Sequence, residues 1–129
     1  MTVLKHLLPD DMAAPFAAYS HGVKISAGTE LVFCSGQLGI APDGSVPEDA
    51  GEQAALCFDN IRRILRDGAM DLSNVVRINA YVTDRAHMRA YMDVRDRLFP
   101  QPAPASTLMI VSGFTREEFK VEIEVVAAK

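Results

Sequence analysis

The spacing of apolar residues along the chain predicts two amphipathic helices. Between residues 47 and 67, apolar side chains recur at steps of three and four, so they form one stripe along a helix. Gly68 is expected to end this helix, because glycine commonly follows a helix C-terminus. Thr83 or Asp84 can cap a second helix that continues to about residue 99, where a proline-rich run stops it. Each helix therefore has one apolar face that must pack against another element.

Five further segments predict β-strands, because apolar and polar residues alternate in them or β-branched residues gather. They cover residues 23–25, 31–34, 76–82, 107–111 and 119–127. The first two are separated by a short loop that contains Gly28, which predicts a hairpin between them. Residues 9–18 mix proline with small residues and are expected to form an irregular lead-in. The predicted order of elements is therefore β-β-α-β-α-β-β.

One face of the predicted sheet is apolar and the other is polar. In the last strand, Val121 and Ile123 alternate with Glu122 and Glu124. This pattern predicts an α+β fold, a single domain over residues 1–129, in which both helices pack on one face of a mixed sheet. The two glutamates then lie on the other face, where they meet solvent, as on an ordinary strand surface, or contact another subunit.

Composition and charge narrow the function classes. The chain has 129 residues, of which 49% are hydrophobic, enough for a globular core. Its formal net charge of −4 argues against a broad nucleic-acid surface, because such binding rests on clustered Lys and Arg. No apolar run approaches the roughly 20 residues that a membrane span needs, and the first residues show no export signal. We therefore expect a cytoplasmic protein that does not enter the membrane.

The sequence carries no recognisable metal-binding or cofactor-binding motif. His6, His21 and His87 lie far apart, and no two share a helix face, so no metal site is expected. No phosphate-binding loop or dinucleotide-binding glycine pattern occurs, which predicts that no flavin, nicotinamide or pyridoxal cofactor is needed. Cys34 and Cys57 fall on a predicted strand and on a helical core stripe, and are interpreted as buried thiols.

Seven short segments, spread in order over nearly the whole chain, carry a further signal. They are Ala18-Tyr19-Ser20-His21-Gly22-Val23, Val32-Phe33-Cys34-Ser35-Gly36-Gln37, Gly44-Ser45-Val46-Pro47-Glu48-Asp49, Asp59-Asn60-Ile61, Val75-Val76-Arg77, Ala80-Tyr81-Val82-Thr83-Asp84 and Val121-Glu122-Ile123-Glu124. Together they resemble the reactive-intermediate deaminase family, also called RidA, YjgF-like or L-PSP-like. The resemblance implies a chorismate-mutase-like fold and a homotrimer with a small-molecule pocket at each subunit interface. The uncovered sheet face would line the centre of that trimer.

The resemblance also implies an activity and a set of site residues. Archetypal members hydrolyse enamines and imines to 2-oxo acids and ammonia, and in them a glutamate in a Val-Glu-Ile-Glu segment positions the attacking water. That role carries over to Glu122, and substrate-binding roles carry over to Tyr19, Ser35 and Gly36. The family's arginine, which grips the substrate carboxylate, does not carry over, because Ser106 stands in its place.

The loss of this arginine predicts a changed substrate. A serine cannot supply the two parallel charge-assisted hydrogen bonds with which arginine binds a carboxylate. We therefore expect weak activity on 2-iminoacids, and a neutral substrate with Glu122 as base and Ser106 as hydrogen-bond donor. A small-molecule-binding module without turnover is the alternative. Endoribonuclease activity is the third interpretation, which the acidic charge and the lack of a basic, aromatic-rich strip disfavour.

Overall fold

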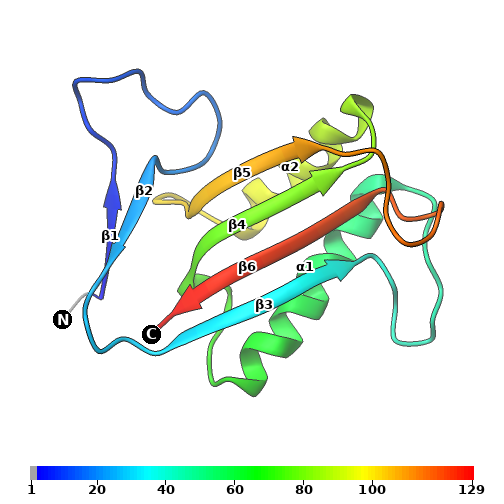
Figure 1. Ribbon diagram of the computed structural model, residues 1–129, viewed down its shortest axis with the longest axis horizontal. Coiled ribbons are helices and arrows are strands. Elements are labelled where there is room, and N and C mark those ends of the chain that lie inside the picture. The colour runs from blue at the N-terminus through cyan, green and yellow to red at the C-terminus, as the bar shows by residue number, and fades with distance from the viewer. Residues whose placement is uncertain (1–2) are drawn as a thin grey trace.

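A four-stranded sheet backed by two helices forms the body of the protein in the computed structural model, which describes residues 3–129. Figure 1 views the sheet with both helices behind it. In spatial order the strands are β3 (Leu31–Leu38), β6 (Val121–Ala128), β4 (Val75–Val82) and β5 (Ala105–Ile110). The predicted α+β fold with two helices on one face of a mixed sheet is confirmed.

The sheet is mixed because one of its three pairings is parallel. β6 runs antiparallel to both of its neighbours, β3 and β4, whereas β4 and β5 run parallel. A parallel pair needs a long crossover, and helix α2 (Met88–Leu98) supplies it between β4 and β5. The last strand in the sequence therefore occupies a central place in the sheet, as Figure 1 shows in red.

Both helices begin and end close to the predicted residues. Helix α1 (Ala50–Asp67) starts three residues later than predicted, where the Asp49 side chain accepts a 2.9 Å hydrogen bond from the backbone N–H of Glu52. It ends at Gly68, whose N–H donates to the backbone oxygen of Leu65 at 2.9 Å. Before α2, a 3-10 turn, η2 (Arg85–His87), is capped by the Asp84 side chain.

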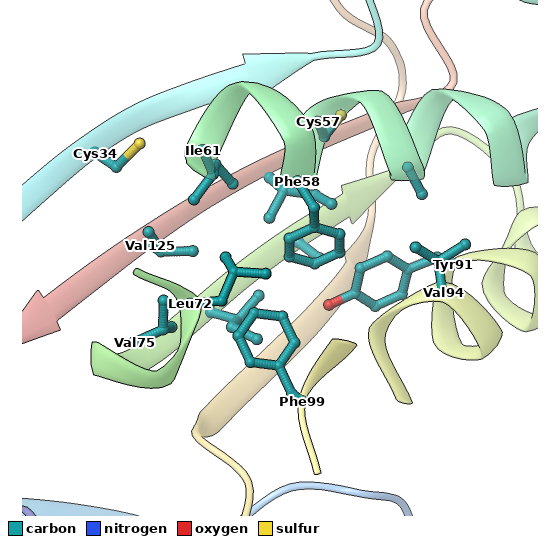
Figure 2. Packing of buried hydrophobic residues seen from close by; sticks show 14 of the residues in the cluster. Cys34, Cys57, Phe58, Ile61, Leu72, Val75, Tyr91, Val94, Phe99 and Val125 are labelled. Carbon is teal, nitrogen blue, oxygen red and sulfur yellow. The ribbon is translucent and has the colours of Figure 1, made fainter. Parts of the chain in front are cut away.

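Aromatic and aliphatic side chains fill the layer between the helices and the sheet. The Phe58 ring lies edge-on to Phe99, with ring centres 5.3 Å apart, and 6.4 Å from the ring of Tyr91 (Figure 2). Cys34 and Cys57 are buried in the same layer, which confirms the interpretation of both as buried thiols. Burial raises the pKa of the Cys57 thiol from 9.0 to about 12.

The N-terminal strands pair differently from the prediction. β1 (Leu4–Leu7), which the sequence analysis missed, pairs antiparallel with β2 (Gly22–Ile25) in a separate two-stranded sheet. The predicted hairpin between residues 23–25 and 31–34 is therefore wrong, although Gly28 does turn the chain there with a φ of 80°. The reason is that β3 buries Cys34 beneath the helices and so joins the main sheet beside β6.

Candidate functional site

The face of the four-stranded sheet that the helices do not cover, here called the open face, gathers polar and aromatic side chains. Strand register places opposite one another Tyr81 and Glu122, Asn79 and Glu124, and Phe33 and Val126. Arg77 also faces this side, beside Ala105 of β5. In Figure 1 the open face is the one toward the viewer.

Glu122 lies on the open face against Gly36. Its strand neighbours Val121 and Ile123 are completely buried on the helix side, so alternation directs Glu122 outward. A β-carbon at Gly36 would come within 2.4 Å of Glu122 Oε1, far closer than any contact between such atoms. β3 has a register shift between Cys34 and Gln37, which brings this glycine next to the carboxylate. The structure thus places two of the predicted site residues, Gly36 and Glu122, in direct contact.

A second carboxylate on the open face is engaged by a tyrosine. The Tyr81 hydroxyl donates a 2.6 Å hydrogen bond to Glu124 Oε1, and this bond raises the pKa of Tyr81. Glu124 also lines a shallow depression of about 250 Å³ together with Ser35 and Asn79. Ser35 therefore lies beside the second glutamate of the motif. The sequence analysis did not single out Tyr81 or Asn79, although both alternate with apolar residues along β4 as open-face residues must.

Tyr19 lies beyond the opposite end of the sheet from Glu122. The backbone N–H of Ser20 donates to Pro104 O at 3.1 Å, and Ser20 pairs with Ala105 at the start of β5. Ala105 pairs with Arg77 of β4, and Arg77 in turn pairs with Val126 of β6. Val126 is four residues from Glu122 along β6, which corresponds to about 13 Å at 3.3 Å per residue. Within one chain, Tyr19 and Glu122 therefore do not share a pocket. Tyr19 instead lines a depression of about 500 Å³ formed by the N-terminal segment.

Ser106 faces the helices, and its expected role beside Glu122 is corrected by the register of β5. Ser106 pairs with Ile78, a completely buried residue on the helix side of β4. Its hydroxyl is buried close to Tyr91 of α2, whose pKa burial raises to about 12. The motif identified Ser106 but could not predict which face of the sheet it occupies. β5 begins at Ala105, and apolar and polar residues do not clearly alternate along it. Ala105 and Thr107, on either side of Ser106, share the open face with Glu122.

The site contains acids, hydroxyls and one cation, with no arrangement suited to a metal. Within residues 3–129, no three His, Cys, Asp or Glu side chains gather closely enough to hold a metal ion. Across the same residues, no helix has the length and apolar character to cross a membrane. The chemistry available on the open face is therefore proton transfer by carboxylates and hydrogen bonding by Ser35, Asn79 and Tyr81.

The fold and this face define a small α+β protein whose mixed sheet carries two carboxylates on its open side. The profile of the family described as Endoribonuclease L-PSP matches residues 10–129. The chain belongs to this family, the RidA/YjgF-like proteins, and the resemblance found in its motifs is confirmed.

Individual relatives agree with this assignment. The mitochondrial protein mmf2 of Schizosaccharomyces pombe is 33% identical over 113 residues, which cover 86% of this chain and 87% of mmf2. The chloroplastic Reactive Intermediate Deaminase A of Arabidopsis thaliana is 30% identical over 98% of this chain and 67% of its own length. The crystal structure of the Rid-family protein YyfB from Yersinia pestis has a TM-score of 0.86 at 20% identity, covering 99% of this chain and all of YyfB. This last likeness supports the fold.

Proposed function

We propose that this protein hydrolyses the C=N bond of a small enamine or imine, with Glu122 as the group that handles the proton of the attacking water. The observation that carries the proposal is the fixed place of the Glu122 carboxylate on the open face, against Gly36. The name of the Arabidopsis relative, Reactive Intermediate Deaminase A, agrees with this class of reaction. Phosphate-bearing RNA fits the face less well, because Glu122 and Glu124 would repel it.

The chemistry needs one base and one water. An enamine first takes a proton on its β-carbon and loses one from nitrogen, and so becomes the imine. Glu122 then accepts a proton from water as the water oxygen bonds to the imine carbon, and the nitrogen gains a proton. In the second step the hydroxyl proton passes to the nitrogen, the C–N bond breaks as the carbon–oxygen double bond forms, and ammonia leaves. No electron carrier is required, since neither carbon nor nitrogen changes its total oxidation level.

We further propose that the protein is a homotrimer and that neighbouring copies cover the open face. Phe33 and Met109, both on this face, are 75% and 52% exposed, an unusual position for large apolar side chains in an isolated subunit. Tyr19 and Glu122 can line one pocket only if they come from different copies, since one chain holds them at opposite ends of the sheet. Sedimentation equilibrium is expected to give a trimer, and a stable monomer at micromolar concentration would disprove the assembly.

The proposed substrate class follows from the residues at the start of β5, where Ser106 stands in place of the family's arginine. Neither Ala105 nor Ser106 can bind a carboxylate as arginine does, and Ser106 is buried on the helix side. We therefore propose slow turnover of 2-iminoacids compared with arginine-bearing relatives, and no role for Ser106 as a donor to the substrate. A cytoplasmic location also remains a prediction, which cell fractionation would test.

The decisive experiment compares the protein with its Glu122→Gln variant. Ammonia release is measured from 2-aminoacrylate and from a neutral enamine. Glutamine keeps the shape of the side chain but cannot accept the proton, so the rate should fall by about 10²–10⁴ while assembly is unchanged. Equal rates for the two proteins would remove Glu122 from the mechanism. Ligand binding without turnover in the parent protein would favour the binding-module alternative.

A further inference from the structure

Arg77 is held on the open face by neutral side chains. Its Nε donates to Asn79 Oδ1 at 2.9 Å, and its Nη2 donates to Thr107 Oγ1 at 2.7 Å. The first acceptor lies on the same strand and the second on β5, so the guanidinium is fixed from two sides. These contacts leave the Nη1 hydrogens and one Nη2 hydrogen unused, because a guanidinium carries five N–H donors.

No carboxylate among the described residues forms an ion pair with this guanidinium. Four ion pairs occur among residues 3–129, and none of them includes Arg77. Glu124, one row further along on the neighbouring strand, accepts instead from the Tyr81 hydroxyl. The cation is therefore oriented without being neutralised, an arrangement typical of residues that recognise an anionic group.

The surroundings of Arg77 favour a small ligand over bulk solvent. Ala105, its neighbour on β5, has only a methyl group. Val126, its neighbour on β6, lines the same depression as Ser35, Asn79 and Glu124. If a second copy covers the open face, as the proposed function requires, Arg77 loses water and an unpaired charge becomes costly. A bound anion would remove that cost.

We propose that Arg77 binds the acidic group of a small organic acid on the open face, with Asn79 and Thr107 as the residues that orient it. This inference rests on the proposed function and names the ligand class of the same face. It agrees with slow turnover of 2-iminoacids. In those molecules the carboxylate sits on the carbon that water attacks, whereas the row of Arg77 lies about 13 Å from the row of Glu122 in one chain. The favoured ligand is an acid whose carboxylate is separated from its C=N or C=O carbon.

Carboxylate recognition at Arg77 alone is tested by a calorimetric binding titration with 4-oxopentanoate, which is too short to reach Glu122 of the same chain, and with its neutral methyl ester. The parent protein should bind the acid more tightly than the ester. Arg77→Gln should weaken acid binding about tenfold to a hundredfold, the range expected for a lost hydrogen bond to a charged group, and leave ester binding unchanged. Arg89→Gln is the matched control, since it removes the same charge from a side chain that is 79% exposed on α2.

Further measurements keep the proposal falsifiable. Thr107→Val removes one acceptor but no charge, and should weaken acid binding by a smaller factor even if Arg77→Gln does not fold. Equal affinity for acid and ester in the parent, or equal effects of Arg77→Gln and Arg89→Gln, would overturn the proposal. So would a loss of assembly in Arg77→Gln with acid binding intact, because Arg77 would then pair with a neighbouring copy. Since binding needs no turnover, acid binding that depends on Arg77 in a protein without deaminase activity would refute the proposed function alone.

Discussion

Replacing Gly36 with alanine should displace the Glu122 carboxylate while leaving the fold intact. The added β-carbon would lie 2.4 Å from Glu122 Oε1 and 2.9 Å from Cδ, against an ordinary contact of at least 3.4 Å. The overlapping atoms are the far end of a flexible side chain at the surface of the sheet. The carboxylate must therefore move by about 1 Å, and turning a side-chain torsion about 30° away from its preferred rotamer to do so costs roughly 0.5–1.5 kcal/mol.

Two opposing effects make the expected change in stability small. Alanine restricts the unfolded chain more than glycine does, a gain of about 0.4–1 kcal/mol that offsets most of the rotamer cost. Gly39→Ala is the matched control at the end of the same strand. There the β-carbon would lie 2.6 Å from Gln53 Cβ and 2.7 Å from Gln53 Cα, so helix α1 itself would have to move. Overpacking of that kind costs about 1–3 kcal/mol or more.

Urea unfolding followed by circular dichroism would measure both variants. We expect the free energy of unfolding of Gly36→Ala to remain within about 1 kcal/mol of the parent, and that of Gly39→Ala to fall further. Hydrolysis of a neutral enamine should nevertheless drop in Gly36→Ala, because the base no longer occupies its place. If Gly36→Ala is destabilised as much as Gly39→Ala, or keeps full activity, the assigned contact between Gly36 and Glu122 is wrong.

Three other substitutions or conditions test the packing around the site. Gln53 is completely buried, donates to two backbone oxygens and accepts from the Lys120 N–H, all at 2.8 Å. Gln53→Ala should therefore lower the free energy of unfolding by roughly 2–4 kcal/mol in a urea titration. A loss below about 1 kcal/mol would contradict this hydrogen-bond network. Ser106→Arg would insert a charge on the helix side of the sheet. We expect it to lower the free energy of unfolding by more than about 3 kcal/mol and not to restore carboxylate binding. A stable variant that binds 4-oxopentanoate more tightly than the parent would show that Ser106 reaches the open face. Burial raises the pKa of Cys57 and of Tyr91 to about 12, from 9.0 and 10.0, so the unfolded chain releases these protons first as the pH rises. Stability should be constant with respect to these groups below about pH 9 and fall between about pH 9 and 12, and an unchanged urea midpoint across that window would count against their burial.

Local patterns predicted the helices and the faces of the central strands. The apolar stripe gave α1 to within three residues, and the alternation around Glu122 placed that residue opposite the helices. These features depend on periods of 3.6 and 2.0 residues, which a sequence displays directly. The pairing of β2 with β1 was not accessible in this way, because the turn at Gly28 is compatible with either partner.

The candidate site was also predictable only in part, because it depends on how strands distant in the sequence pair with one another. The motifs pointed to Gly36 and Glu122, which the structure holds in contact. They did not reveal that Ser106 faces inward, since β5 is a short strand whose register is fixed by the crossover through α2. Nor did they single out Arg77, because its significance comes from its neighbours on two strands. Asn79 and Thr107 accept its hydrogen bonds, and it has no ion pair among residues 3–129.

The central place of β6 constrains how the protein can fold on the ribosome. A nascent chain that ends at Lys120 contains both helices and all other strands. In it β4 can pair with β5, but β3 has no partner in the main sheet until β6 is made. Residue 31 finds its partner at residue 128, so the sheet closes only after nearly the whole sequence has left the exit tunnel. Until then helix α1, which packs on β3 and β6, lacks part of the sheet that buries its apolar face, and this makes the incomplete chain a natural client for chaperones.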